Sequence, residues 1–225
     1  IGAEALIRWN HPTKGLISPN SFIPIAEQFG LIQKLQNIVL RDICILLETL
    51  RDHNALKNQF NVSINISQCQ FNSSTLKGEL FKAIETYDVL PSQIKLEITE
   101  SMLAGDLMST VKQMKELKSQ GFVFSIDDFG TGYSCLKHLS VLPIDELKID
   151  KSFIDKVLDN ASGQSIVQSI IGLGHSLDIN IVAEGVESAE QLHILKSMGV
   201  NAVQGFLFAK PLTHSNYLKW HKEHQ

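Results

Sequence analysis

Five oxygen-bearing side chains could together hold metal ions, and each lies in or at the end of an apolar, β-branched run. They are Glu4, Asn65, Glu97, Asp127 and Asp128. Carboxylate and amide oxygens are hard ligands, and no Cys or His accompanies them, which favours Mg²⁺ or Mn²⁺ over zinc. Two adjacent aspartates suit a pair of ions with one carboxylate bridging them. Paired divalent ions are used for phosphoryl transfer to water, so the residue types point to that chemistry.

These side chains need a scaffold that brings distant parts of the chain together. Seven runs predict β-strands, and the amphipathic stretches between them predict helices. The strand runs are residues 3–9, 60–67, 94–99, 123–128, 146–150, 180–185 and 202–207. This alternation predicts a mostly parallel α/β sheet, either closed into a barrel or open and doubly wound. Because no Gly-rich dinucleotide fingerprint or P-loop follows an early strand, an open nucleotide-binding sheet is disfavoured.

Polar residues recur on one face of several predicted strands. Since side chains alternate along a strand, Glu4 is expected to share a face with Arg8, and Glu146 with Lys148. In a barrel the outer faces pack against helices, so the polar faces would point inward, where charges need partners. Carboxylates meeting there at about 4–5 Å repel by several kcal/mol per pair. We therefore expect that some are protonated or that cations bind between them.

Length and composition limit the alternatives. The chain has 225 residues, 44% of them apolar and 20% charged, and no linker or shift in composition, so residues 1–225 are predicted to form one domain. A net charge of −4 argues against a broad basic surface for DNA or RNA. Three widely spaced cysteines indicate neither a disulfide framework nor a zinc site. The most apolar stretch, residues 38–50, contains charged residues and is too short to span a bilayer.

The two ends of the sequence carry further expectations. The chain begins at Ile1 and shows no signal peptide, so we interpret it as an N-terminally truncated fragment of a longer protein. A barrel of eight βα units usually needs about 250 residues, which places an eighth strand upstream of residue 1. Near the other end, His221 and His224 are expected to face solvent.

A series of short motifs follows in order along nearly the whole chain. It begins with Glu4-Ala5-Leu6 and Arg8-Trp9. It continues with Ile64-Asn65-Ile66-Ser67, Glu97-Ile98-Thr99-Glu100, Asp127-Asp128-Phe129-Gly130-Thr131-Gly132-Tyr133-Ser134, Lys148-Ile149-Asp150, Glu184-Gly185-Val186-Glu187 and Gln204-Gly205. Any one of these motifs is weak evidence alone. Together, and in this order, they resemble the EAL domain family of cyclic di-GMP phosphodiesterases.

This resemblance implies a fold and a reaction. The implied fold is an α/β, TIM-like (β/α)8 barrel with one reversed strand, and the family's first strand, which precedes the Glu-Ala-Leu signature, is missing from this chain. The implied reaction is hydrolysis of cyclic di-GMP to linear pGpG with two Mg²⁺ or Mn²⁺ ions, which ends a bacterial second-messenger signal.

The resemblance also implies a role for each matching residue. One metal ion would be held by Glu4, Asn65, Glu97 and Asp127, and the second by Asp127 and Asp128. Glu184 would act as general base, Lys148 would orient or stabilise the attacking water, and Gln204 would support the metal and water layer. Arg8 would face a substrate phosphate. Glu100 would anchor the mobile loop after Asp128, which contains Gly130 and Gly132, and Glu187 would support the site from behind.

Other interpretations of single residues stay open. Glu4 could simply pair with Arg8, and Asp127-Asp128 could be a turn or helix cap. Asp150 is interpreted as a cap without a chemical role. For the whole chain, one alternative is a catalytically inactive receptor that binds cyclic di-GMP and signals to a partner. Another is a different metal-dependent barrel enzyme, with chemistry resembling that of enolases.

Partners and location follow from the resemblance as expectations. Domains of this kind serve signalling proteins, so we expect a homodimer and an upstream sensor or GGDEF-type domain. Neither nucleic acid nor direct insertion into a membrane is expected of this domain. The expected location is the cytoplasm, either free or as the cytoplasmic part of a membrane-anchored protein.

Overall fold

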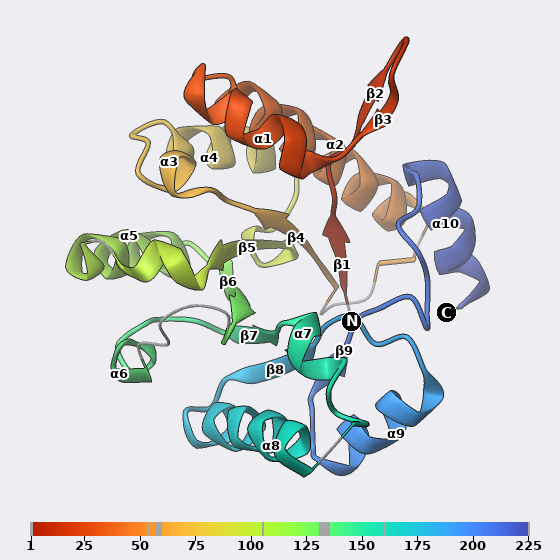
Figure 1. Ribbon diagram of the computed structural model, residues 1–225. Helices are drawn as coiled ribbons and strands as arrows, with labels where there is room; N and C mark the ends of the chain where they lie inside the picture. Colours follow the sequence, from red (N-terminus) through yellow and green to blue (C-terminus); the bar gives the residue numbers. More distant parts are fainter. Residues whose placement is uncertain are drawn as a thin grey trace. The chain divides into compact units, whose positions relative to one another are not determined.

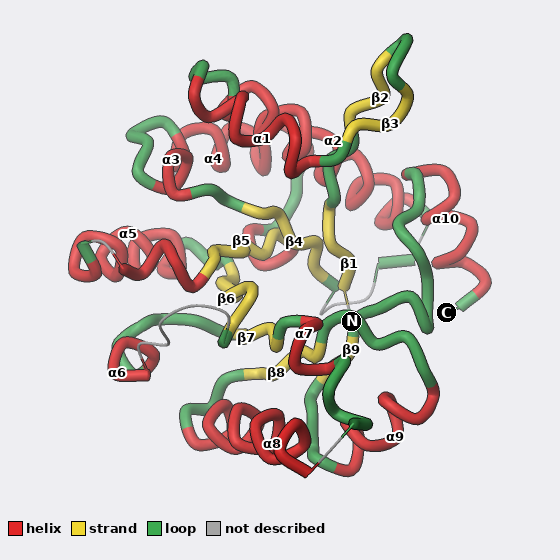
Figure 2. Tube along the Cα trace, in the orientation of Figure 1, coloured by secondary structure: helices red, strands yellow, loops and turns green. Residues whose placement is uncertain are grey.

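The computed structural model describes residues 2–53, 55–56, 60–104, 106–130, 136–159 and 161–224 (Figures 1 and 2). Contacts within the chain divide it into two compact units. The first unit comprises Ile1–Leu96 and Thr213–Gln225, and the second comprises Glu97–Leu212. Strand β5 (Ile94–Thr99) contributes residues to both. Among the helices that the structure describes, none combines the length and the hydropathy that crossing a bilayer requires.

The first unit contains a parallel strand pair and several helices. Strand β1 (Gly2–Ala5) pairs with β4 (Asn61–Asn65) from Gly2 opposite Asn61 to Ala5 opposite Ile64. The helical segments of this unit are α1 (Pro19–Gln28), α2 (Ile32–Asp52), α3 (Gln68–Phe71), α4 (Leu76–Tyr87), the 3₁₀ segment η1 (Pro91–Gln93) and α10 (His214–Glu223). The predicted strand at 60–67 is thus present in shortened form.

The predicted first strand, residues 3–9, is wrong in its second half. Strand β1 ends at Ala5, and the chain then forms an antiparallel hairpin of β2 (Trp9–His11) and β3 (Gly15–Ile17). Gly15 has a φ of +71°, which glycine adopts without steric cost, and it closes the hairpin turn. Arg8 therefore lies beyond the strand, and strand alternation does not place it on the face of Glu4.

Helix α2 supplies much of the core of the first unit. Its buried residues recur at three- and four-residue spacing and form one stripe, which comprises Ile32, Gln36, Leu40, Ile43, Cys44, Leu47 and Leu50. This helix packs against α4 and β4. Burial raises the pKa of the Cys44 thiol to about 11, so this cysteine stays protonated and behaves as a small apolar residue.

The expectation that His221 faces solvent is wrong. Its side chain is only 9% exposed, because its ring stacks on Tyr217 and meets the edge of Phe60. Its Nε2 donates to the carbonyl oxygen of Ala55 at 3.1 Å. Helix α10 is therefore bound to the segment that follows α2, within the same unit (Figure 1).

The second unit is built on parallel strands in the order β6-β7-β8-β9. Their bounds are β6 (Val123–Phe129), β7 (Glu146–Ile149), β8 (Asn180–Ala183) and β9 (Ala202–Val203). The helical segments are η2 (Glu100–Ala104), α5 (Leu107–Ser119), α6 (Leu136–Leu139), α7 (Lys151–Ile154), α8 (Ala161–Ser176) and α9 (Ala189–Ser197). Because neighbouring strands are parallel, their carboxyl ends lie at the same edge of the sheet. Each strand continues there into a helical segment or a loop (Figure 2).

Two predicted strands of this unit are shorter than expected. Strand β8 ends at Ala183 because Gly185 turns the chain with a φ of +69°. Strand β9 ends at Val203, and Gly205 follows against the backbone of Val186, where a Cβ atom would collide. Glu184 and Gln204 therefore lie directly after the last residues of their strands.

The contact between α8 and β8 generates a stability prediction. A Cβ atom at Gly174 would overlap the buried side chain of Ile181, whereas at Gly172 it would meet nothing within 4 Å. We expect Gly174→Ala to lower the free energy of unfolding by about 1–3 kcal/mol through overpacking. The matched control Gly172→Ala, in the same helix, should raise it by about 0.5–1 kcal/mol. Urea unfolding measures both, and equal effects would contradict the packing argument.

Candidate active site

A buried lysine lies at the centre of the acidic residues of the second unit. The Nζ of Lys148 is 2.6 Å from Glu184 Oε1, 3.1 Å from Glu97 Oε1 and 3.3 Å from Asp127 Oδ1. The side chains of Lys148 and Glu97 are only 2% and 1% exposed. Those of Asp127 and Glu184 are 13% and 17% exposed. Because an isolated charge is costly to bury, the burial of the lysine requires the carboxylates, and the burial of the carboxylates requires the lysine.

Strand alternation positions this group, as the sequence pattern predicts. Glu146 and Lys148 lie on the same face of β7, and Ser125 and Asp127 lie on the same face of β6. Ser125 pairs in register with Glu146, and its Oγ donates to Glu146 Oε1 at 3.1 Å. Two residues further along both strands, Asp127 faces Lys148. The polar face of β6 is therefore matched to the polar face of β7.

The Asp127-Asp128 pair lies where β6 departs from regular pairing. The register with β7 shifts between Ile126 and Phe129, and Asp128 has a φ of +54°, which is unusual for a residue with a side chain. The backbone N–H of Asp128 donates to Asp127 Oδ1 at 3.0 Å. Carboxylate oxygens of Asp127, Asp128 and Glu184 all lie within 4.8 Å of one another. The bulge thus brings two consecutive carboxylates to one side.

These oxygens fit a hard divalent cation. One ammonium group, that of Lys148, faces three carboxylates, and Asp128 adds a fourth beside them, so the group carries excess negative charge. All the donor atoms in this group are oxygens, which suits Mg²⁺ or Mn²⁺. A bound cation would relieve the repulsion that remains after Lys148 has paired. The sequence-based expectation of a metal-binding group is therefore supported within the second unit.

The turn after β8 presents Glu184. The Glu184 N–H donates to the Ile149 carbonyl at 3.1 Å, which continues the sheet by one more bond. Backbone bonds also tie Gln204 to this turn, since its N–H donates to Ala183 and its carbonyl accepts from Val186. The Gln204 side chain is exposed, and its predicted role in the metal and water layer stays a prediction.

Glu100 touches the start of the loop that the resemblance expects it to anchor. Its side chain is buried, and Oε2 accepts from the Gly130 N–H at 3.0 Å. Gly130 has a φ of +96°, and a Cβ there would collide with the ring of Phe153. Residues 131–135, including Gly132, lie outside the described residues. The contact of Glu100 is thus in place, and its anchoring role stays a prediction.

The predicted site residues Glu4, Asn65 and Arg8 belong to the first unit. Asn65 Nδ2 donates to Glu4 Oε1 at 2.9 Å across the parallel pair of β4 and β1. Arg8 is exposed, and its Nη1 donates to the carbonyl oxygen of Ile7 at 2.9 Å. Glu4 and Asn65 are therefore brought together as predicted. Their meeting with Glu97 and Asp127, and the substrate contact of Arg8, stay predictions.

Sequence reasoning missed the contacts of Lys151, which lies against the segment that follows Glu184. Its Nζ is 2.9 Å from Glu187 Oε1 and 2.8 Å from Asp155 Oδ1. A lysine just after a strand usually extends into solvent, so it gave no signal alone. Its position directly after the Lys148-Ile149-Asp150 motif was the available clue.

By contrast, Asp150 caps α7 as expected, because its side chain accepts from the Ser152 N–H at 3.0 Å.

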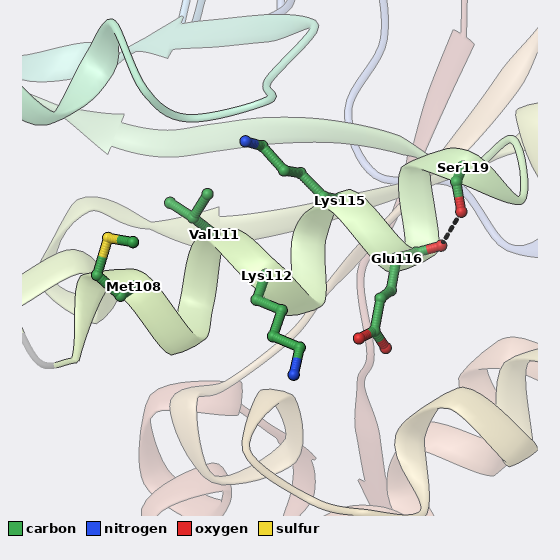
Figure 3. A pocket seen from close by; sticks show the side chains of 6 residues that line it. All are labelled: Met108, Val111, Lys112, Lys115, Glu116 and Ser119. Carbon is green, nitrogen blue, oxygen red and sulfur yellow. Dashed lines mark hydrogen bonds between the residues drawn. The ribbon is translucent and has the colours of Figure 1, made fainter.

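A surface hollow of the second unit lies along α5, apart from this chemistry. Figure 3 shows its lining, with Lys112 and Lys115 on either side of the helix and the hydroxyl of Ser119 directed at the Glu116 backbone. Met108 at its edge is 77% exposed. None of the lining residues is a predicted site residue, so we assign the chemistry to the acidic group around Lys148.

Comparison with known proteins supports the fold and the family resemblance. The family model of the EAL domain matches residues 1–211. Among solved structures, the chain resembles the PaMucR phosphodiesterase in complex with c-di-GMP, with a TM-score of 0.90 and 38% identity over 95% of this chain and 86% of that chain. It also resembles the EAL domain protein from Listeria monocytogenes EGD-e, with a TM-score of 0.83 and 29% identity over 98% and 85%. The predicted α/β fold of this family is thereby confirmed.

Curated relatives are longer proteins. The chain is 40% identical over 212 residues to the bifunctional diguanylate cyclase/cyclic di-GMP phosphodiesterase MucR of Pseudomonas aeruginosa, covering 94% of this chain and 31% of the relative. It is 39% identical over 209 residues to the cyclic di-GMP phosphodiesterase NbdA of the same organism, covering 93% and 26%. The chain thus spans a third or less of these relatives.

The buried charges around Lys148 generate a second prediction. Lys148→Met removes the ammonium and leaves carboxylates unpaired, so we expect the free energy of unfolding to fall by about 3–5 kcal/mol when a chelator is present. The matched control is Lys118→Met. Lys118 pairs with Asp145 at 2.8 Å but is 36% exposed, so its loss should cost about 1 kcal/mol or less. Urea unfolding compares the two, and losses of equal size would contradict the proposed interdependence of the buried charges.

Proposed function

Because the chain belongs to the EAL domain family, we propose that it hydrolyses cyclic di-GMP to linear pGpG and so ends a bacterial second-messenger signal. The relatives named as cyclic di-GMP phosphodiesterases support the substrate. The observation that carries the proposal is the acidic group of Asp127, Asp128 and Glu184, with ligand oxygens within 4.8 Å of one another beside Lys148. Such a group suits the stabilisation of a phosphate ester under attack by water.

Two divalent cations, Mg²⁺ or Mn²⁺, complete the proposed site. The proposed ligands of the first ion are Glu4, Asn65, Glu97 and Asp127. The proposed ligands of the second ion are Asp127 and Asp128, with solvent completing the shell. When bound, the ions supply electrostatic stabilisation of the phosphate oxygens and lower the pKa of a coordinated water.

The chain's own residues handle the proton of the reaction. Glu184 is the proposed general base, because its partly exposed carboxylate can reach a water while Lys148 holds it from behind at 2.6 Å. The water oxygen attacks the phosphorus, Glu184 accepts its proton, and the bond from phosphorus to O3′ breaks. The departing O3′ takes up a proton from solvent, to which Glu184 releases the proton that it accepted, and the phosphate stays on the 5′ side, which gives pGpG.

The other predicted residues would bind or position. Arg8 would donate to a substrate phosphate through its guanidinium, which offers paired donors. Gln204 would support the metal and water layer. Glu100 would hold the start of the loop after Asp128 through its bond to Gly130. Glu187 would support the turn that carries Glu184.

The larger context is also part of the proposal. Residues 1–225 would form one catalytic domain of a longer signalling protein, with an upstream sensor or GGDEF-type domain and a second copy as partners. The greater length of the relatives supports the proposal of a longer protein. The net charge of −4 supports the exclusion of DNA and RNA. The cytoplasmic location stays a prediction.

Turnover is tested with cyclic di-GMP and either Mg²⁺ or Mn²⁺, with pGpG measured by chromatography. We expect turnover by the wild type and a fall in kcat of about 10²–10⁴-fold in Glu184→Gln, because the general base is lost. Glu190→Gln, on the exposed first turn of α9, is the control and should keep full activity.

Two results would contradict the proposed reaction. Tight binding of cyclic di-GMP without turnover in either metal would select the receptor interpretation. Binding of divalent ions without binding of the nucleotide would select a different metal-dependent enzyme.

Metal binding is tested directly by calorimetric titration of the protein with Mn²⁺. Asp127→Asn removes a charged ligand, and we expect the affinity to fall by about tenfold or more. Asp150→Asn is the matched control, since Asp150 caps α7 and asparagine caps helices equally well. An Asp127→Asn variant that binds Mn²⁺ like the wild type would exclude the proposed ligand set.

A further inference from the structure

Lys151 makes two ion pairs and one close packing contact at the corner between β7 and α7. Its Nζ lies 2.8 Å from Asp155 Oδ1 and 2.9 Å from Glu187 Oε1. Hydrogen bonds to these carboxylates raise the pKa of Lys151, so it stays charged at neutral pH. Its aliphatic stem covers Gly185, where a Cβ atom would collide with the stem atoms.

The turn that Lys151 covers is the one that presents Glu184. Gly185 has a φ of +69°, in the left-handed region, within the segment Glu184–Glu187 that leads from β8 to α9. The turn is bound through its backbone, since Val186 donates to the Gln204 carbonyl and Glu187 donates to Gln191 Oε1 at 2.8 Å. From α7, the Lys151 Nζ donates to Glu187 Oε1 of this segment at 2.9 Å.

Two lysines three positions apart thus hold two glutamates three positions apart. Lys148 holds Glu184 at 2.6 Å inside the protein, and Lys151 holds Glu187 at 2.9 Å at the surface. The cap of Asp150 on α7 fixes the backbone between the two lysines. An exposed ion pair adds little to the free energy of unfolding, so the pair of Lys151 and Glu187 contributes little to stability. Its position, three residues after the proposed general base, instead suits a role in holding Glu184 in place.

We propose that Lys151 is a positioning residue, which fixes the turn of Glu184–Glu187 so that the Glu184 carboxylate is held in place for the reaction. This inference rests on the proposed function. Lys151 acts through Glu187 and through its stem on Gly185. Small displacements of a reacting group can reduce turnover greatly, so a surface tether can matter for kcat without mattering for folding.

The kinetic test is a double-mutant cycle of Lys151→Met and Glu187→Gln. Methionine keeps the stem over Gly185 and removes the charge. We expect each single variant to lose about tenfold in kcat with KM nearly unchanged, and the double variant to lose no more than either single. Lys151→Arg, which keeps the charge, should restore most of the loss. Lys156→Met, an exposed lysine on the segment after α7, is the control and should match the wild type.

A second readout is independent of activity. Amide hydrogen exchange over residues 184–187 should be about tenfold faster in Lys151→Met than in the wild type and unchanged in Lys156→Met. Unchanged exchange in Lys151→Met would overturn the proposal, and so would faster exchange with wild-type kcat, or independent, multiplying losses in the cycle. A wild type without phosphodiesterase activity would instead refute the proposed function, and the exchange rates would still decide whether Lys151 holds the turn.

Discussion

The acidic site of the second unit depends on the ion pairs that the buried ammonium of Lys148 makes with three carboxylates. Glu97, Asp127 and Glu184 each approach it within 3.3 Å, and they come from three different segments of the chain. None of these charges could be buried alone without a large cost in solvation. The lysine therefore allows carboxylates to gather where strand ends meet. Because one ammonium faces three carboxylates, the group carries excess negative charge, which suits the proposed cation site.

The backbone is irregular beside the partly exposed carboxylates. Asp128 adopts a positive φ where β6 loses register with β7, and Gly185 does the same just after β8. Both departures occur at the carboxyl ends of parallel strands, where side chains are free of the regular ladder. The ion pair of Lys151 and Glu187 joins the segments that follow β7 and β8 at these ends.

Sequence patterns predicted the strands well where apolar runs were long. The runs at 94–99 and 123–128 correspond closely to β5 and β6, and alternation placed Glu146 and Lys148 on one face of β7. Prediction failed where a few residues changed the direction of the chain. The hairpin of Trp9–His11 and Gly15–Ile17 is too short to give a periodic signal, so the first strand was drawn too long.

The order of motifs by itself determined the family and the identities of the candidate ligands, because residue types and their succession are properties of the chain alone. Tertiary structure decided which of those groups neutralise one another. It paired Lys148 with Glu97, buried His221 between two aromatic rings, and placed Lys151 in an ion pair with Glu187. The reason is physical: the cost of a charge or a polar ring depends on its distance to groups remote in sequence, and only the folded chain sets that distance.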